Sequence, residues 1–460
     1  MDDSNTTPGF DIALGPFGQQ PSLNIYTQIT SCYALPESVS YPDLIDNLRD
    51  GLRLLSANFP WLAGQIIKTA TSENDSDVFR IRPLDGVPRL SIQDLREDVS
   101  TPTMNQMREA RFPFGMLDEK VVAPIDTFPN PSMSPIPVFA MQATIITGGF
   151  LLTFLAHHQA MDITALGQIT HLLSKACNGQ SYTEDEFTAG NLSHQNIIPL
   201  LEDDWKPVTA KPDDAKSATQ DQVSEDQATT PQSPHCSWAY FAFNSESLAA
   251  LKTLATNAID SSSGFVSTDD SLSAFIWQSV ARTRLARSEP TKNITFARAV
   301  DPRRFLNIAI TYPGLVQNMT YHTRTLQQLV ESPLGEIASN LRAAVEPRTS
   351  TLAHDTRALA TLLHRASDKS KIDVTAKLDL STDIMLSSWT KERCYDFEFN
   401  LGLGKPEAVR RPQFSPVESL MYLMPKRRDG EVVLGLCLRD EDMDQLRADT
   451  EFSRYASFIG

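Results

Sequence analysis

The chain has 460 residues, 41% of them hydrophobic and 21% charged, which is typical of a globular protein with two domains. Its formal net charge of −16 repels nucleic acid and anionic membrane surfaces, so we expect neither as a partner. The five cysteines are scattered without a CxxC pair, so we expect neither a disulfide framework nor a zinc ribbon, and a reducing compartment fits best.

The N-terminal residues predict one strand and one long helix. The chain begins with an acidic stretch that has no apolar core, so we expect no signal peptide, and its apolar stretches are too short to span a membrane. Residues 23–34 are rich in β-branched and aromatic residues, which is typical of a strand. A helix is predicted over residues 41–58 because leucines recur on one face, at Leu44, Leu48, Leu52 and Leu55.

The next informative region predicts two strands followed by a helix. Residues 138–147 and 150–157 are apolar segments separated by Gly148 and Gly149, which is typical of two strands joined by a turn. A helix is predicted over residues 162–177, where apolar side chains return at helical spacing at Ile163, Leu166, Ile169, Leu172 and Leu173. The second strand therefore leads almost directly into the helix.

One segment differs in composition from the rest of the chain. Residues 206–234 contain almost no large apolar side chain and are rich in Pro, Ser, Thr, Asp and Gln, so they cannot bury enough surface to offset the entropy of ordering. We interpret them as an exposed crossover linker between two domains. The predicted domains are an N-terminal lobe over residues 1–205 and a C-terminal lobe over residues 235–460.

The second half again mixes helix and strand patterns. A helix is predicted to begin at Thr268, with Asp269 and Asp270 in its first turn, where carboxylates favour the positive end of the helix dipole. Residues 432–438 resemble a strand, and the C-terminus resembles a helix. Because strands and helices alternate throughout, the predicted fold class is α/β or α+β.

The most informative motif is a histidine pair followed by an aspartate, formed by His157, His158 and Asp162. A histidine at the end of a strand is held rigidly and titrates near neutrality, which suits a general base, and Asp162 is placed to orient it or to fix the loop. Two buried histidines that are hydrogen-bonded without chemistry fit the same pattern. A metal site is disfavoured, because adjacent side chains on a strand point to opposite faces.

A second motif lies in residues 395–412, which read YDFEFNLGLGKPEAVRRP. Its glycines permit positive φ angles and close backbone approach, and Pro406 stiffens the exit of the segment. It lacks the glycine spacing of a nucleotide-binding loop, so a structural turn is the simpler interpretation. The cations Lys405, Arg410 and Arg411 fit either a solvated face or a site for phosphate groups.

The two motifs together resemble those of the BAHD acyltransferases, which carry HxxxD in the first half and DFGWG near the C-terminus. His158 and Asp162 match the first motif, and the second is occupied, with substitutions, by Glu398, Phe399, Asn400, Leu401 and Gly402. Longer stretches, among them SLNIYTQI, FVSTDDSLSAFIW, RAVDPR and GLGKPEAVRRP, resemble the fungal trichothecene 3-O-acetyltransferases over nearly the whole chain.

This resemblance implies two similarly built lobes of the chloramphenicol acetyltransferase type, with the active-site channel between them. It implies that His158 is the general base and that Asp162 forms a structural ion pair with Arg303. The residues implied to lie beside the coenzyme A pantetheine arm and thioester are Ser267, Thr268, Ser387, Ser388 and Trp389. Structural roles are implied for the glycine-rich loop, at Glu398, Phe399, Gly402, Gly404 and Pro406.

The implied reaction moves an acetyl group from acetyl-CoA, as co-substrate, to a hydroxyl group of a hydrophobic fungal metabolite, such as the C-3 hydroxyl of a trichothecene. We expect no metal, no acyl-enzyme and no membrane insertion, and a monomer in the cytoplasm. Alternatives are an acceptor alcohol from another terpenoid, an alkaloid or a polyketide, a condensation-type domain of peptide synthesis, and a small-molecule binding protein that has kept the fold without activity.

Overall fold

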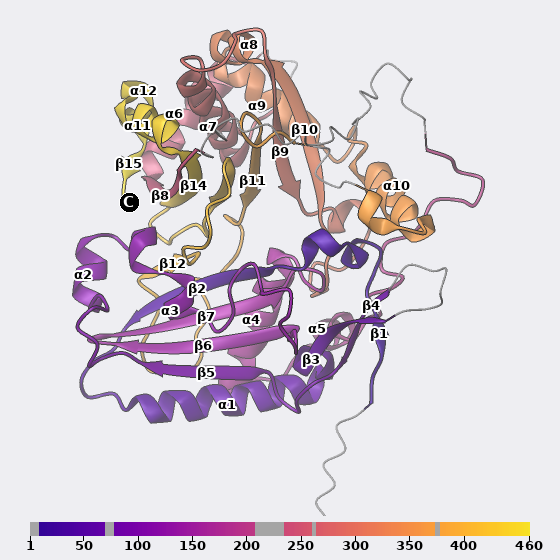
Figure 1. The fold of residues 1–460 in the computed structure, drawn as a ribbon, viewed down its shortest axis with the longest axis vertical. Coiled ribbons are helices and arrows are strands. Elements are labelled where there is room, and N and C mark those ends of the chain that lie inside the picture. Colours follow the sequence, from indigo (N-terminus) through magenta and orange to yellow (C-terminus); the bar gives the residue numbers. More distant parts are fainter. Residues whose placement is uncertain (1–8, 70–77, 208–233, 260–263, 373–377) are drawn as a thin grey trace, which may run out of the picture.

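The computed structural model describes residues 9–69, 78–207, 234–259, 264–372 and 378–460. In Figure 1 the chain forms two layers, with the first half around one sheet and the second half around another. The larger sheet has the strand order β10-β9-β11-β13-β14-β8-β15, a second has the order β12-β2-β7-β6-β5, and a small one has the order β1-β4-β3. This mixture of helices and sheets is the predicted fold class.

The described part of the first half contains the following strands and helices: β1 (Ile12–Ala13), β2 (Tyr26–Ala34), α1 (Tyr41–Asn58), β3 (Gly64–Thr69), β4 (Val78–Pro83), β5 (Arg89–Asp94), α2 (Met104–Glu109), α3 (Glu119–Val122), β6 (Phe139–Ile146), β7 (Gly149–His157), α4 (Ile163–Cys177) and α5 (Glu184–Gly190). The predicted helix over residues 41–58 is confirmed with the same bounds. The predicted pair of strands and the helix after it are also confirmed, as β6, β7 and α4.

The described part of the second half contains β8 (Cys236–Phe243), α6 (Ser245–Asn257), α7 (Thr268–Arg284), β9 (Asn293–Val300), β10 (Asn318–Thr325), α8 (Leu326–Glu331), α9 (Leu334–Ala343), α10 (Leu352–Arg365), β11 (Ile384–Ser388), β12 (Ala408–Arg410), β13 (Leu420–Leu423), β14 (Val432–Arg439), α11 (Asp440–Ala448), α12 (Thr450–Tyr455) and β15 (Ser457–Phe458). The helix predicted to begin at Thr268 is α7, which begins there. Helix α7 is buried along most of its length, so it belongs to the core of the larger sheet.

The position of β7 in its sheet fixes the His158 region. Strand β7 lies between β2 and β6 and pairs with both in antiparallel fashion, with Tyr26 of β2 opposite His157. Every residue of β7 is buried, which is why its sequence is a continuous apolar run. Helices α1 and α4 pack together beside this sheet. The end of β7 is therefore held by two neighbouring strands.

The last third of the chain also contributes to the first sheet. Strand β12 pairs with β2, with Ala408 opposite Cys32 and Arg410 opposite Thr30. A segment from beyond residue 235 thus adds an edge strand to the sheet of the first half (Figure 1). The division into lobes 1–205 and 235–460 stays a prediction, and most of the predicted linker, residues 208–233, lies outside the described residues. Within the described ranges, no helix has the length and apolar character needed to cross a membrane.

Candidate active site

The predicted base lies at the junction between strand β7 and helix α4. The backbone N–H of His158 donates to the carbonyl oxygen of Ile25 at 2.8 Å, next to the start of β2. The N–H groups of Ala160 and Met161 both donate to the carbonyl oxygen of His157, at 3.0 and 3.1 Å. These bonds close a tight turn, so the His158 backbone is fixed from both sides.

The hydrogen bonds of the His158 ring decide which nitrogen carries the proton. Its Nδ1 lies 3.0 Å from the carbonyl oxygen of Met161. A carbonyl oxygen can only accept a hydrogen bond, so Nδ1 is the protonated nitrogen and Nε2 keeps a free lone pair. Among the described residues, Nε2 has no hydrogen-bond partner. The side chain is half-buried, and its Nε2 is available to take a proton.

The surroundings of His158 favour its neutral form. Burial lowers the pKa of the imidazole below its ordinary value, and the positive charge of Arg411 acts in the same direction. The Met161 carbonyl and the Asp162 carboxylate act against this decrease. The ring therefore stays unprotonated, and able to accept a proton, at neutral pH.

His157 has a different environment. Its ring is fully buried, its Nε2 lies 3.0 Å from Asn24 Oδ1, and it packs edge-on against Tyr26 with 5.0 Å between ring centroids. Burial lowers the pKa of His157 to about 3, so it is neutral at physiological pH. As expected for the last residue of the strand, His157 lies in the interior while His158 lies beyond the strand end.

Asp162 joins the two layers of the molecule. Its Oδ1 accepts the N–H of Ala165 at 2.8 Å, which makes Asp162 the N-cap of α4. Its Oδ2 accepts the Arg303 guanidinium at 2.8 Å and the N–H of Val316 at 2.7 Å. The ion pair that the resemblance implied between Asp162 and Arg303 is therefore present, and both side chains are buried.

The remaining bonds of Arg303 bind it to its own loop. Its guanidinium also bonds Asp301 and three backbone carbonyls, those of Tyr312, Gly314 and Val316. Burial acts to lower the pKa of Arg303, but the carboxylates of Asp162 and Asp301 hold it above its ordinary value. The charge is thus fully compensated, and the pair fastens the start of α4 to the segment after β9.

The residues predicted to meet the acyl donor gather at the end of β11 and the start of α7. The Trp389 indole N–H donates to Ser387 Oγ at 3.0 Å, and the Ser388 hydroxyl donates to Asp269 at 2.6 Å. Ser267 is the N-cap of α7, where its hydroxyl accepts the N–H of Asp270 at 3.1 Å. Because Asp269 lies in the first turn of α7, its bond to Ser388 connects the two groups of predicted residues.

The glycine-rich loop packs against the helix side of the first sheet. The carbonyl oxygen of Glu398 accepts from Ser174 at 2.6 Å and from Asn178 at 2.7 Å, both at the end of α4. The Phe399 ring lies 5.4 Å from that of Phe154 on β7. Positive φ angles occur in this loop at Asn400, Gly402 and Gly404, and Pro406 is buried. The contacts support the structural role that remains a prediction for this loop.

Three residues near the site differ from the sequence-based interpretation or were not identified by it. Arg410 and Arg411 are both buried, so the interpretation of this charge run as a solvated face is wrong. Glu392 has no sequence signal, yet burial raises the pKa of its carboxyl to about 7. Its Oε1 accepts the Thr164 hydroxyl at 3.2 Å, in the first turn of α4. All three residues are wholly or partly buried by contacts with distant segments, which local composition does not report.

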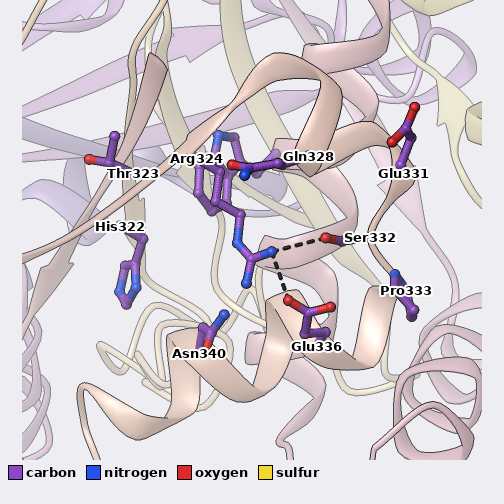
Figure 2. Close-up of a pocket in the computed structure, with 10 residues that line it drawn as sticks. His322, Thr323, Arg324, Gln328, Glu331, Ser332, Pro333, Glu336 and Asn340 are labelled. Atoms are coloured by element: carbon purple, nitrogen blue, oxygen red, sulfur yellow. Dashed lines mark hydrogen bonds and ion pairs between the residues drawn. The ribbon is translucent and has the colours of Figure 1, made fainter. Parts of the chain in front are cut away.

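An open cavity of about 780 Å³ lies away from this site. Figure 2 shows Arg324 of β10 pointing into it, bonded to Ser332 and to Glu336 of α9. His158 does not line this cavity, so the cavity is not a substrate channel that leads to the proposed base. Within the part of the chain that the structure describes, no group of three or more His, Cys, Asp or Glu side chains is arranged to hold a metal ion.

Comparisons with known proteins agree along the whole chain. Residues 119–453 match the model of the Transferase family, and residues 25–177 match that of the trichothecene 3-O-acetyltransferase-like N-terminal domain. An O-acetyltransferase of Cryptosporiopsis sp. is 47% identical over 96% of each chain. A trichothecene 3-O-acetyltransferase of Fusarium sporotrichioides is 45% identical over 99% of each. The crystal structure of this Fusarium protein with coenzyme A and T-2 has a TM-score of 0.89, covering 98% of this chain and 100% of that one.

Proposed function

The chain belongs to the Transferase family, as a relative of the trichothecene 3-O-acetyltransferases, and we propose from this premise that it transfers an acetyl group from acetyl-CoA to the C-3 hydroxyl of a trichothecene. The names of the Fusarium relative and of its complex with coenzyme A and T-2 support this acceptor and donor. The observation that carries the proposal is the neutral His158, whose Nε2 is free while Nδ1 is bonded to Met161.

His158 removes the proton of the acceptor hydroxyl. An alcohol is a weak nucleophile at neutral pH because its pKa is far above 7, and a base within hydrogen-bond reach takes its proton as the new bond forms. The Met161 carbonyl holds the ring in the tautomer that this step requires, and it stabilises the imidazolium that results. Asp162 does not exchange protons in this scheme. It holds the turn in place through Ala165 and Arg303.

The acyl donor fits the polar residues at the start of α7 and the end of β11. Acetyl-CoA supplies a thioester on a pantetheine arm whose amide groups need hydrogen-bond partners. Polar side chains from both segments would hold this arm, since Ser388 is bonded to the first turn of α7. They are those of Ser267, Thr268, Ser387, Ser388 and Trp389. The Ser387 oxygen accepts from Trp389, so its own hydroxyl proton is directed elsewhere and is available to a developing negative charge.

The thiols of this chain do not provide a nucleophile for an acyl-enzyme. A thiolate is the reactive form of cysteine, and it is disfavoured where burial raises the pKa. Burial raises the pKa of all five thiols, to about 12 for three of them: Cys32, Cys177 and Cys437. We therefore propose direct transfer, in which the alcohol oxygen bonds to the acetyl carbon, the carbon–sulfur bond of the thioester breaks, and the coenzyme A thiolate leaves and takes a proton from the His158 imidazolium or from water. The five free cysteines also support the cytoplasm as the compartment, and we propose a monomer.

A panel of alcohols tests both the reaction and the acceptor. The purified protein is incubated with acetyl-CoA and either a trichothecene with a free C-3 hydroxyl, the same compound blocked at C-3, or unrelated terpenoid, alkaloid and polyketide alcohols. We expect thiol release and a product heavier by one acetyl group with the free C-3 compound alone. Faster acetylation of an alcohol from another class would show that the proposed trichothecene acceptor is wrong. No thiol release with any alcohol would favour a binding protein without activity.

A further inference from the structure

Arg411 is a buried cation enclosed by aromatic rings. It follows β12 directly and is 3% exposed. Its guanidinium carbon lies 4.3 Å from the ring centroid of Phe414, 4.8 Å from that of Tyr422 and 5.7 Å from that of Trp389. Aromatic faces attract a guanidinium, and they do so more strongly when water is excluded. We call these three rings the aromatic box.

The charge in this box is in direct contact with no carboxylate among the described residues. The guanidinium makes one hydrogen bond there, from Nη2 to Thr127 Oγ1 at 3.3 Å, and its Nε has no partner. The Glu119 carboxylate, whose Oε2 accepts the N–H of Thr127 at 2.6 Å, acts on Arg411 from beyond that threonine. Buried charges in proteins are normally paired directly, because leaving water without a partner is costly. A buried cation without a directly bonded carboxylate therefore calls for a functional explanation.

The box is linked to both the predicted base and the predicted acyl-donor strand. The Thr127 carbonyl accepts the N–H of Tyr26 at 2.8 Å, and the carbonyl of the preceding residue, Ile25, accepts the N–H of His158 at 2.8 Å. Thr127 and His158 are thus bonded to adjacent residues at the start of β2. The Trp389 ring of the box is bonded to Ser387 at the end of β11. Arg411 therefore contacts the acyl-donor side directly, through Trp389, and is linked to the His158 backbone through Thr127 and the start of β2.

The neighbouring arginine provides a contrast. Arg410 is equally buried, at 3% exposure, and packs over the Tyr240 ring at 5.3 Å. Its guanidinium donates to the carbonyl oxygens of Arg111, Phe112 and Val409 at 3.1 to 3.2 Å. These bonds occupy the side chain in holding the backbone together. Arg410 is thus a structural arginine, matched to Arg411 in burial and in sequence position.

We propose that Arg411 is a positioning cation of the active site, whose buried charge keeps His158 unprotonated and favours the negative charge that develops on the reacting oxygens. This rests on the proposed function. The charged and titratable groups that act on the His158 ring are Asp162 at the start of α4 and Arg411 beyond β12, with His157 neutral beside it. Asp162 favours the imidazolium and forms a direct ion pair with Arg303. Arg411 opposes the imidazolium, and its nearest compensating carboxylate, Glu119, lies beyond Thr127.

The test removes the charge and keeps the volume. Arg411→Met places an apolar, flexible side chain in the aromatic box, where sulfur packs well and a buried charge is often replaced without loss of stability. We expect kcat to fall roughly 10- to 10³-fold, the scale of losing one charge-stabilising group. We also expect the acid limb of the kcat/KM pH profile to move upward by about half a pH unit or more, as removal of a nearby positive charge requires.

Three further variants decide between a functional and a structural role. Arg411→Lys keeps the charge and should retain the position of the acid limb, and Arg410→Met should leave the limb unchanged whatever it does to thermal stability. Arg411→Gln is a second neutral variant, for use if Arg411→Met does not fold. A folded neutral variant that has the same kcat as the wild type, and the same acid limb in its kcat/KM pH profile, would overturn the proposal. Failure of both neutral variants to fold would also overturn it, because the charge would then be structural.

A direct titration separates this proposal from the proposed function. The His158 imidazole is followed by NMR against pH in the wild type and in Arg411→Met, without substrates. We expect its midpoint to rise in the variant by the same amount as the acid limb. If the wild type shows no turnover, the proposed function fails, and the titration still tests Arg411. If the enzyme is active and the titration midpoint of His158 is the same in the variant, the proposed role of Arg411 is wrong and the proposed function stands.

Discussion

Two adjacent serines at the end of β11 have different hydrogen-bond partners. Ser388 donates its hydroxyl proton to Asp269 at 2.6 Å, so that proton is committed to the structure. Ser387 accepts the indole N–H of Trp389 at 3.0 Å, so its own proton is still available. Only the second arrangement leaves a donor for a developing oxyanion. The two positions therefore form a matched pair in which the same substitution has different expected consequences.

We expect Ser387→Ala to lower kcat by roughly 10²- to 10³-fold with little change in KM, the scale of losing one oxyanion donor. Ser388→Ala should instead lower the melting temperature, because it leaves the Asp269 carboxylate with one partner fewer. Steady-state kinetics and thermal melts on both variants make the comparison. Equal kcat losses in the two variants would show that Ser387 has no special place in the reaction.

Among single residues, the sequence identified the proposed base but not its environment. His158 and Asp162 belong to a motif of fixed spacing, so five consecutive residues are enough to identify them. The charge run at Arg410 and Arg411 resembles a surface segment. Arg411 is nevertheless buried, because three rings from residues 389, 414 and 422 close around it. Those partners lie next to Arg411 only after β11, β12 and β13 have been placed.

The junction of β7 and α4 is fastened to the second layer by the Asp162–Arg303 pair. Both side chains are buried, and the distance between Asp162 Oδ2 and Arg303 Nη2 is 2.8 Å. Removing one partner leaves the other charge buried without compensation, which typically costs roughly 3–5 kcal/mol of folding free energy. We expect Asp162→Ala and Arg303→Ala to lower both stability and activity. The double variant should lose much less than the sum of the two, by a coupling of roughly 1–3 kcal/mol.

A double-mutant cycle measured by denaturant unfolding gives this coupling. Asp162→Asn serves as the control, because it keeps the hydrogen bond to Ala165 and removes the charge. Losses in the single variants that simply add would rule out the ion pair as a unit. Abolished turnover in Asp162→Asn with normal stability and acetyl-CoA affinity would instead assign Asp162 a chemical role.

Elements that local patterns define were predicted well. The helix over residues 41–58 follows from its leucine spacing, and the strands and helix around His158 follow from two apolar runs and a change of period. Strand β12 was not predicted, because it has three residues and pairs with β2, more than 370 positions earlier in the chain. Such pairing depends on the whole topology and leaves little trace in a short sequence window.

For the whole molecule, buried neutral histidines predict a loss of stability in mild acid. Burial lowers the pKa of His157 to about 3 and those of His194 and His322 to about 4. In the unfolded chain each titrates near 6.5, so between pH 6.5 and about 4 the unfolded state binds more protons and stability rises with pH. Glu392, with its pKa raised to about 7, acts in the opposite direction between pH 4.5 and 7. The combined effect of the three histidines on the free energy of unfolding is larger than the opposite effect of Glu392.

We therefore expect the melting temperature to fall as the pH is lowered from 6.5 to 5, in buffers of constant ionic strength. His194→Gln removes one of the three groups and should make this fall shallower. The window stays above the range where most surface carboxylates gain protons, so changes in the net charge contribute little. A melting temperature that rises over this window, or an unaltered slope in His194→Gln, would contradict the account.

The two-layer fold follows from the sequence only in part. Alternating strand and helix signals predict the fold class, and the family resemblance predicts two similarly built lobes. Neither predicts that β12, from the second half of the chain, adds a strand to the first sheet, directly before Arg411. The proposed active site thus combines a motif that is local in sequence with a cation whose position is a property of the complete fold.

The proposed function depends on His158 as the base in acetyl-CoA-dependent acetylation of a hydroxyl group. It is tested by the rate of thiol release from acetyl-CoA, with a free C-3 trichothecene as acceptor, in the wild type, His158→Ala and His157→Ala. We expect a loss of roughly 10²- to 10⁴-fold in a folded His158→Ala. We expect a smaller loss in His157→Ala, whose main effect should be a lower melting temperature. A folded His158→Ala with the wild-type rate, or His157→Ala as the inactive variant, would contradict the proposed role of His158.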